Sequence, residues 1–104
     1  MRASKRKKLT GTGWAVGDAR DLLGLSPEEE AYIELRLKLA DGLKARRSRK
    51  KLTQVELAKS LGSSQSRVAK MEAGDPTVSV DLLVRSLIAL GADSREIAKI
   101  IAAR

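Results

Sequence analysis

The chain has 104 residues, of which 42% are apolar, and its formal net charge is +8. It contains no cysteine and no histidine, which excludes disulfides and zinc–thiolate sites and removes the commonest general base and metal ligand. We therefore expect one domain without a cofactor or a metal, and a protein that is not an enzyme.

Charge is distributed unevenly along the chain. Residues 1–13 carry five basic and no acidic side chains, residues 14–34 carry six acidic and one basic, and residues 35–52 carry eight basic and one acidic. The basic balance favours a polyanionic partner, and the alternation suggests two kinds of contact surface. No apolar run reaches the roughly 20 residues of a membrane helix, so we expect a cytoplasmic protein with no membrane contact.

The N-terminal third is predicted to have two parts. Residues 1–13 are expected to be a disordered basic arm, which is either a solubilising tail or a segment that contacts phosphates. Residues 14–34 form an N-terminal extension, which begins with a minor helix around Asp18–Leu23 that Gly24 ends.

A long helix is predicted from Pro27 to about Arg49. Ser26 and Glu29 have the spacing of a capping box, and proline suits the first helical position. The apolar residues form two neighbouring stripes, where a surface helix usually has one. The first stripe is Ala31, Leu35, Leu39 and Leu43, and the second is Ile33, Leu37 and Ala40. The second stripe is either covered by residues 14–25 or offered to a second copy or a partner.

Four shorter helices follow, each with a polar cap at its start. The caps are Thr53 with Glu56, Ser64, Ser79, and Asp93 with Glu96, and the helix-ending glycines are Gly62, Gly74 and Gly91. The second of these helices is expected to run from Gln65 to about Ala73. Because no alternating strand pattern is present, the chain is predicted to be all-α, with one minor helix and five main ones.

The two helices on either side of Gly62 have the spacing of a helix-turn-helix unit. If Gln54 is the first residue, Ala58 is the fifth, Gly62 the ninth and Val68 the fifteenth. The small Ala58 lets the second helix cross closely, Gly62 permits a left-handed turn, and Val68 fills the angle between the helices.

The stretch LTQVELAKSLGSSQSRVAKMEAG resembles the Cro/repressor (Xre, lambda-repressor-like) helix-turn-helix family, over about residues 39–90. The resemblance implies a five-helix DNA-binding domain, here residues 35–104, preceded by the extension and with a lengthened first helix. With its lead-in GTGWAVGDARDLLGLSPEEEAYIEL, the chain also resembles HigA-like antitoxins and related Xre regulators.

The resemblance assigns roles to individual residues. The expected base contacts at the start of the recognition helix are Ser64, Gln65, Ser66 and Lys70. Glutamine pairs with adenine and lysine donates to guanine, whereas Ala69 stands where the family often has a larger polar reader. The resemblance makes Gln54 a phosphate contact, and Gln54 also opens a helix, where an anion is favoured. By their positions, Arg67 at the side of the recognition helix and Lys50 and Lys51 next to Gln54 are further expected phosphate contacts. Arg47 and Glu72 are expected to form a structural ion pair.

Two functions follow from these expectations. The first is a sequence-specific transcriptional regulator, a repressor of its own operon that binds palindromic double-stranded DNA as a homodimer in the bacterial cytoplasm and nucleoid. The helices that begin after Ser79 and Asp93, or the N-terminal extension, would form the dimer. The alternative is an antitoxin that blocks a basic ribonuclease toxin of the RelE/HigB type through the acidic residues 14–34. A scaffold that makes only protein contacts is a third, less supported reading.

Overall fold

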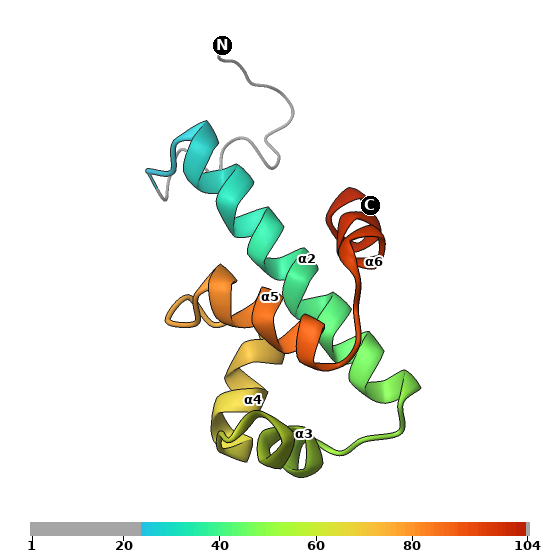
Figure 1. Cartoon of the computed structure of the whole chain (residues 1–104). Coiled ribbons are helices and arrows are strands. Elements are labelled where there is room, and N and C mark those ends of the chain that lie inside the picture. Colours follow the sequence, from blue (N-terminus) through green and yellow to red (C-terminus); the bar gives the residue numbers. More distant parts are fainter. Residues whose placement is uncertain (1–23, 104) are drawn as a thin grey trace. The chain divides into compact units, whose positions relative to one another are not determined.

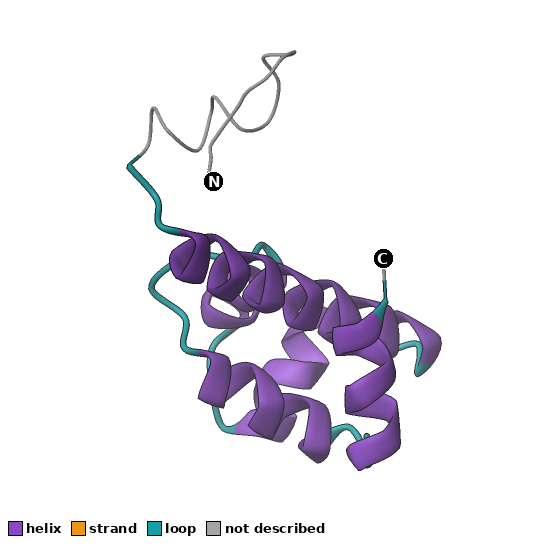
Figure 2. Cartoon of the chain, turned by 90° about the horizontal axis from the view of Figure 1, so that it is seen from above, coloured by secondary structure: helices purple, strands orange, loops and turns teal. Residues whose placement is uncertain are grey.

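The computed structural model describes residues 24–103, and all regular structure in them is helical (Figures 1 and 2). The helices are α2 (Pro27–Arg49), α3 (Gln54–Leu61), α4 (Gln65–Glu72), α5 (Val80–Ala89) and α6 (Ser94–Ala102). The predicted all-α class and the five main helices are therefore confirmed. The basic arm and the minor helix expected around Asp18–Leu23 lie outside the described residues. None of the helices in residues 24–103 has the length and apolar character that crossing a membrane requires.

The described residues belong to two units, one that ends at Ile33 and one that begins at Glu34. In the first unit, Ser26 and Glu29 make both bonds of the predicted capping box, because each backbone N–H donates to the other side chain, at 2.9 and 3.1 Å. Three glutamates occupy the first turn of α2, where the positive end of the helix dipole favours them.

The second unit has an aliphatic core to which α2–α5 all contribute. Its buried apolar residues are Leu39, Leu43, Leu57, Ala58, Val68, Met71, Val78, Leu83, Leu87, Leu90 and Ala92. The two predicted stripes of α2 are covered unevenly. Leu39 and Leu43 of the first stripe and Ala40 of the second are buried, whereas Leu37 of the second stays 44% exposed. Arg36, between the stripes, is instead buried, which the apolar pattern of the sequence does not predict.

The last helix, α6, lies directly against the middle of α2 (Figure 1). A Cβ atom placed on Gly42 would be 2.8 Å from the side chain of Ile100, so the close approach depends on the missing side chain. The Lys38 ammonium donates to the carbonyl of Ile101 at 3.2 Å across the same contact. No residue of α6 is fully buried, so the position of α6 depends on these contacts with α2.

Arg46 fixes the start of α6 to α2. Its Nε donates to the carbonyl of Leu90 at 3.0 Å, and its two terminal nitrogens lie 3.1 and 3.4 Å from the carboxylate of Glu96. Glu96 also accepts the N–H of Asp93 in the predicted capping box. The side chain of Arg46 is 12% exposed, so this bidentate pair is partly shielded from solvent and defines where α6 begins.

Gly42→Ala is expected to lower the free energy of unfolding, although alanine has a helix propensity about 1 kcal/mol better than glycine. The new methyl group would press on the branched side chain of Ile100. In an Ile100→Ala background the clash is absent, so the same substitution should raise stability by about 0.5–1 kcal/mol. Urea unfolding of the wild type, the two single variants and the double variant measures the coupling between the two positions. Additive effects on the free energy of unfolding would show that α6 does not pack against Gly42.

Candidate nucleic-acid interface

The helix-turn-helix unit consists of α3 and α4, which meet at Gly62. The hydroxyl of Thr53 accepts the N–H of Glu56 at 3.0 Å, and the Glu56 carboxylate accepts the N–H of Thr53 at 2.8 Å. Gly62 has φ +66°, the left-handed conformation that the turn was predicted to need. Ser64 then caps α4 by accepting the N–H of Arg67 at 3.1 Å.

The contact between α3 and α4 is closely packed. Leu57 and Val68 are fully buried, and Ala58 is 3% exposed. A larger side chain at Ala58 would force the two helices apart. The small and branched residues that the sequence places at these positions therefore hold α4 at a fixed angle to α3, with its opposite face exposed.

A continuous hydrogen-bonded network runs from the end of α2 to the start of α4. Arg47 makes two bonds to the Glu72 carboxylate, at 2.5 and 3.0 Å, which is the pairing expected for these residues. The side-chain amide of Gln54 donates to the same carboxylate at 3.1 Å. The amide of Gln65 donates to the Gln54 side-chain oxygen at 2.7 Å. The predicted base reader Gln65 is thus connected to a buried ion pair.

The electrostatics of the buried pair favour its charged form. Burial alone would raise the pKa of the Glu72 carboxyl, but the hydrogen bonds from Arg47 and Gln54 outweigh it, so the pKa lies below its usual value. The hydrogen bond to Glu72 raises the pKa of the Arg47 guanidinium against the opposing effect of burial. Glu72 is therefore an ionised acceptor at neutral pH.

The ionised carboxylate determines how both amides are oriented. Because a carboxylate only accepts hydrogen bonds, Gln54 must turn its NH₂ group towards Glu72 and its oxygen towards Gln65. Gln65 must in turn direct its NH₂ group at Gln54. One N–H and the side-chain oxygen of Gln65 remain available, and Gln65 is exposed at the first position of α4.

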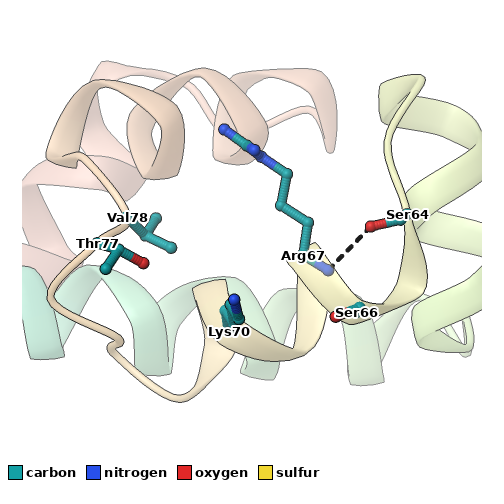
Figure 3. A pocket seen from close by; sticks show the side chains of 6 residues that line it. All are labelled: Ser64, Ser66, Arg67, Lys70, Thr77 and Val78. Atoms are coloured by element: carbon teal, nitrogen blue, oxygen red, sulfur yellow. Dashed lines mark hydrogen bonds between the residues drawn. The ribbon is translucent and has the colours of Figure 1, made fainter.

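A shallow cleft of about 250 Å³ lies on the other side of α4 (Figure 3). Its lining residues are Ser64, Ser66, Arg67, Lys70, Thr77 and Val78. Figure 3 shows Arg67 and Lys70 on α4 across from the loop that carries Thr77 and Val78. The backbone N–H and the hydroxyl of Thr77 both donate to Asp75, at 2.8 and 2.6 Å, and these bonds lower the pKa of Asp75. The loop beside the cleft is therefore locally fixed.

The structure places the predicted contact residues around one free face. The side chains of Ser64, Gln65, Ser66, Arg67 and Lys70 are all exposed on α4 or at its cap. Lys50 and Lys51 are exposed where α2 ends, just before Thr53 and Gln54. Basic side chains thus lie both in the segment before α3 and in the cleft beside α4.

The sequence did not predict three of these features: the Gln54 bonds to Gln65 and to Glu72, and the cleft with its Thr77 loop. A signal for the first was present, because Gln54 and Gln65 open consecutive helices of one helix-turn-helix unit. The turn at Gly62 brings α4 back across α3, and in the structure the two amides lie 2.7 Å apart.

The comparison with protein families agrees with this geometry. A family model described as a helix-turn-helix domain matches residues 38–100, the span from the middle of α2 into α6. No curated protein and no solved structure gives a significant match. Since the match covers more than half of the chain, the protein belongs to the helix-turn-helix domain family and is a DNA-binding protein of that kind.

Proposed function

We propose that this protein is a sequence-specific transcriptional regulator of the Xre type, a repressor that binds a palindromic operator as a homodimer and represses its own operon. The family match supports a DNA-binding regulator in general. The observation that carries the finer proposal is the amide of Gln65, which Gln54 and Glu72 hold in one orientation on the free face of α4.

The fixed amide is suited to adenine. Adenine presents an N7 acceptor and an N6 donor in the major groove, and a glutamine that offers one N–H and one oxygen matches both. These are the two groups that Gln65 retains after it donates to Gln54. Ser64, which caps α4, and Ser66 and Lys70 on α4 complete the proposed base contacts.

Phosphate contacts are proposed on both sides of the recognition helix. Lys50, Lys51 and Gln54 would bind the backbone on the side of α3, where Gln54 keeps one N–H after its bond to Glu72. Arg67, at the cleft on the other side, would bind the opposite strand. Contacts of this kind position a helix in the major groove without reading sequence.

Dimerisation is proposed through α5 and α6. Ile88 on α5 is 56% exposed and Ile101 on α6 is 40% exposed, so both helices offer apolar surface outside the core. A symmetric pair of such domains would place its recognition helices about 34 Å apart, one turn of DNA. The N-terminal extension is the alternative dimer surface.

The test is a titration of the purified protein with the duplex upstream of its own gene and with a scrambled duplex of equal composition. We expect tighter binding of the native duplex at every salt concentration. We also expect the logarithm of the binding constant to fall with log salt at about 0.9 per phosphate contacted. Equal affinity for both duplexes would refute sequence reading, and no binding at low salt would refute DNA binding altogether.

A second function, an antitoxin of a type II toxin–antitoxin pair, is favoured by one feature of the first unit. An apolar cleft of about 300 Å³ is lined by Leu25, Tyr32 and Ile33 and by the glutamates Glu28 and Glu29. An apolar surface with an acidic rim suits a basic protein partner, as a ribonuclease toxin would be. Co-expression with the neighbouring reading frame tests this, because absence of both a stable complex and relief of toxicity would exclude it.

A further inference from the structure

Four helices of the described chain end with the same pair of backbone hydrogen bonds. In each, the residue in the left-handed position donates three residues back, and the next residue donates five residues back, which is the Schellman pattern. The donor–acceptor pairs of the second kind are Leu52 to Arg47, Ser63 to Ala58, Asp75 to Lys70 and Ala92 to Leu87, at 3.2, 2.8, 3.1 and 3.0 Å. Four equivalent positions in one domain can therefore be compared directly.

Glycine occupies the left-handed position at three of these ends, and lysine occupies it at the fourth. Gly62, Gly74 and Gly91 have φ values of +66°, +72° and +89°, and Lys51 has φ +59°. Lys51 is the one non-glycine residue with positive φ in residues 24–103. A side chain in this conformation crowds its Cβ atom against the backbone carbonyl, whereas glycine avoids the crowding.

The left-handed turn at Lys51 is imposed by the residues that follow it. Leu52 is partly buried against the core, and its carbonyl accepts a bond from Arg47 at 2.7 Å. Thr53 then begins α3 with both bonds of its capping box. The backbone therefore cannot relax at Lys51 without disturbing the core, the ion pair of Arg47 or the start of α3.

The lysine side chain has no compensating contact in the described part of the chain. Lys51 is exposed, and none of the ion pairs and hydrogen bonds found among residues 24–103 uses its ammonium group. Its position is three residues before Gln54, on the side of α3 where the phosphate contacts are proposed. The charge is thus directed at solvent from a backbone position that glycine would fill at lower free energy.

We propose that Lys51 is a DNA-affinity residue held at the expense of stability, at a position where folding alone favours glycine. The inference rests on the proposed DNA-binding function and deepens it. It assigns to one residue two effects of opposite sign, because the ammonium strengthens phosphate binding while the left-handed backbone weakens the fold. A purely structural role for Lys51 would give both effects the same sign.

The test compares Lys51→Gly with Lys50→Gly. Both variants lose one positive charge and gain one glycine, but Lys50 precedes the left-handed position and its N–H makes a helical bond to Arg46. Lys51→Gly should raise the melting temperature by about 4–8 °C, whereas Lys50→Gly should lower it. Circular dichroism at 222 nm follows both transitions without any DNA.

Binding is measured on a fluorescent duplex of mixed sequence at about 50 mM salt. Lys51→Gly should bind about tenfold more weakly than the wild type, and its salt slope should be smaller by about one. Lys51→Arg, which keeps the charge, should restore affinity and leave the melting temperature near that of the wild type. Lower stability in Lys51→Gly, or unchanged affinity and slope, would overturn the proposal. Failure of the wild type itself to bind the duplex would instead refute the proposed function.

Discussion

Arg47→Met is expected to lower the free energy of unfolding by about 3 kcal/mol. The Glu72 side chain is 3% exposed and that of Arg47 is 14% exposed, so the substitution leaves an almost fully buried carboxylate without its counter-ion. Removing one partner of a buried pair costs about 3–5 kcal/mol, because the remaining charge cannot be solvated. Methionine keeps most of the apolar stem, so the loss reports the polar contacts of Arg47, which are the pair with Glu72 and the bond to the Leu52 carbonyl, more than the packing. Urea unfolding at neutral pH gives the value.

The matched control is Arg85→Met, which breaks a pair of the same chemistry on the surface. Arg85 contacts Asp81 at 2.9 Å on α5, but the two side chains are 76% and 74% exposed. An exposed pair of this spacing contributes about 0.3–0.5 kcal/mol. If both substitutions had equally small effects, the buried network would not be what holds α2, α3 and α4 together.

The pH dependence separates charge from packing in Arg47→Met. In the wild type the pKa of Glu72 is depressed, so its contribution is fully present above the usual glutamate pKa of about 4.3 and is lost as pH falls through the lower folded value. In the variant the hydrogen bond and charge of Arg47 are gone, so we expect burial to outweigh the remaining hydrogen bond from Gln54 and to raise the pKa of Glu72. The buried carboxylate then lowers the free energy of unfolding of the variant at neutral pH, and its protonation removes that loss. The difference in unfolding free energy between the wild type and the variant should therefore become smaller between pH 7 and about pH 4. A difference that stays constant would indicate lost packing alone.

The local features of the fold could be predicted from the sequence because they depend on neighbouring residues. A capping box needs a hydroxyl or carboxylate and a glutamate three residues later, which Thr53 and Glu56 supply in the linear sequence. The left-handed end of α3 likewise depends on Gly62. The start of α2 and all four later helices follow from signals of this kind.

The features that could not be predicted depend on distant packing. Whether Leu37 is covered is decided by elements far along the chain, and the pattern of α2 alone does not specify them. The burial of Arg36 is not predicted for the same reason, because an apolar periodicity assigns an arginine to the exposed side of a helix. The left-handed Lys51 is missed for another reason. The letters KKL contain no residue that favours positive φ, and the conformation is imposed by Leu52 and Thr53.

The network also explains why a structural ion pair and a base reader belong to one unit. Glu72 lies at the end of α4 and Gln65 at its beginning, so both ends of the helix are fixed by side chains from outside it. Arg47 holds the far end to α2, and Gln54 holds the near end to α3. A helix held at both ends loses little further freedom on binding, which reduces the entropy that recognition must overcome.

Gln65→Ala is expected to remove discrimination at one A·T base pair of each half-site. A bidentate pair with adenine contributes about 1–3 kcal/mol of discrimination, so preference for that base should fall by about fivefold to 150-fold. Gln65 is exposed and uncharged, and its bond to Gln54 is also exposed, so the loss of that bond should lower the free energy of unfolding by about 1 kcal/mol at most, and the salt slope should hardly change. Selection from a randomised duplex pool with both proteins identifies the base pair, and titration of single-base variants measures the loss.

Gln54→Ala tests whether base selection depends on the orientation of the Gln65 amide as well as on its presence. It leaves Gln65 in place but removes the oxygen that fixes the Gln65 amide at 2.7 Å, so the preferred base should stay the same while discrimination weakens by less than in Gln65→Ala.

Lys51→Ala is the opposite comparison, because the loss of a phosphate contact should weaken binding to all duplexes alike and reduce the salt slope by about one. An unchanged selected sequence with Gln65→Ala would mean that the amide on the free face of α4 is not what reads the operator.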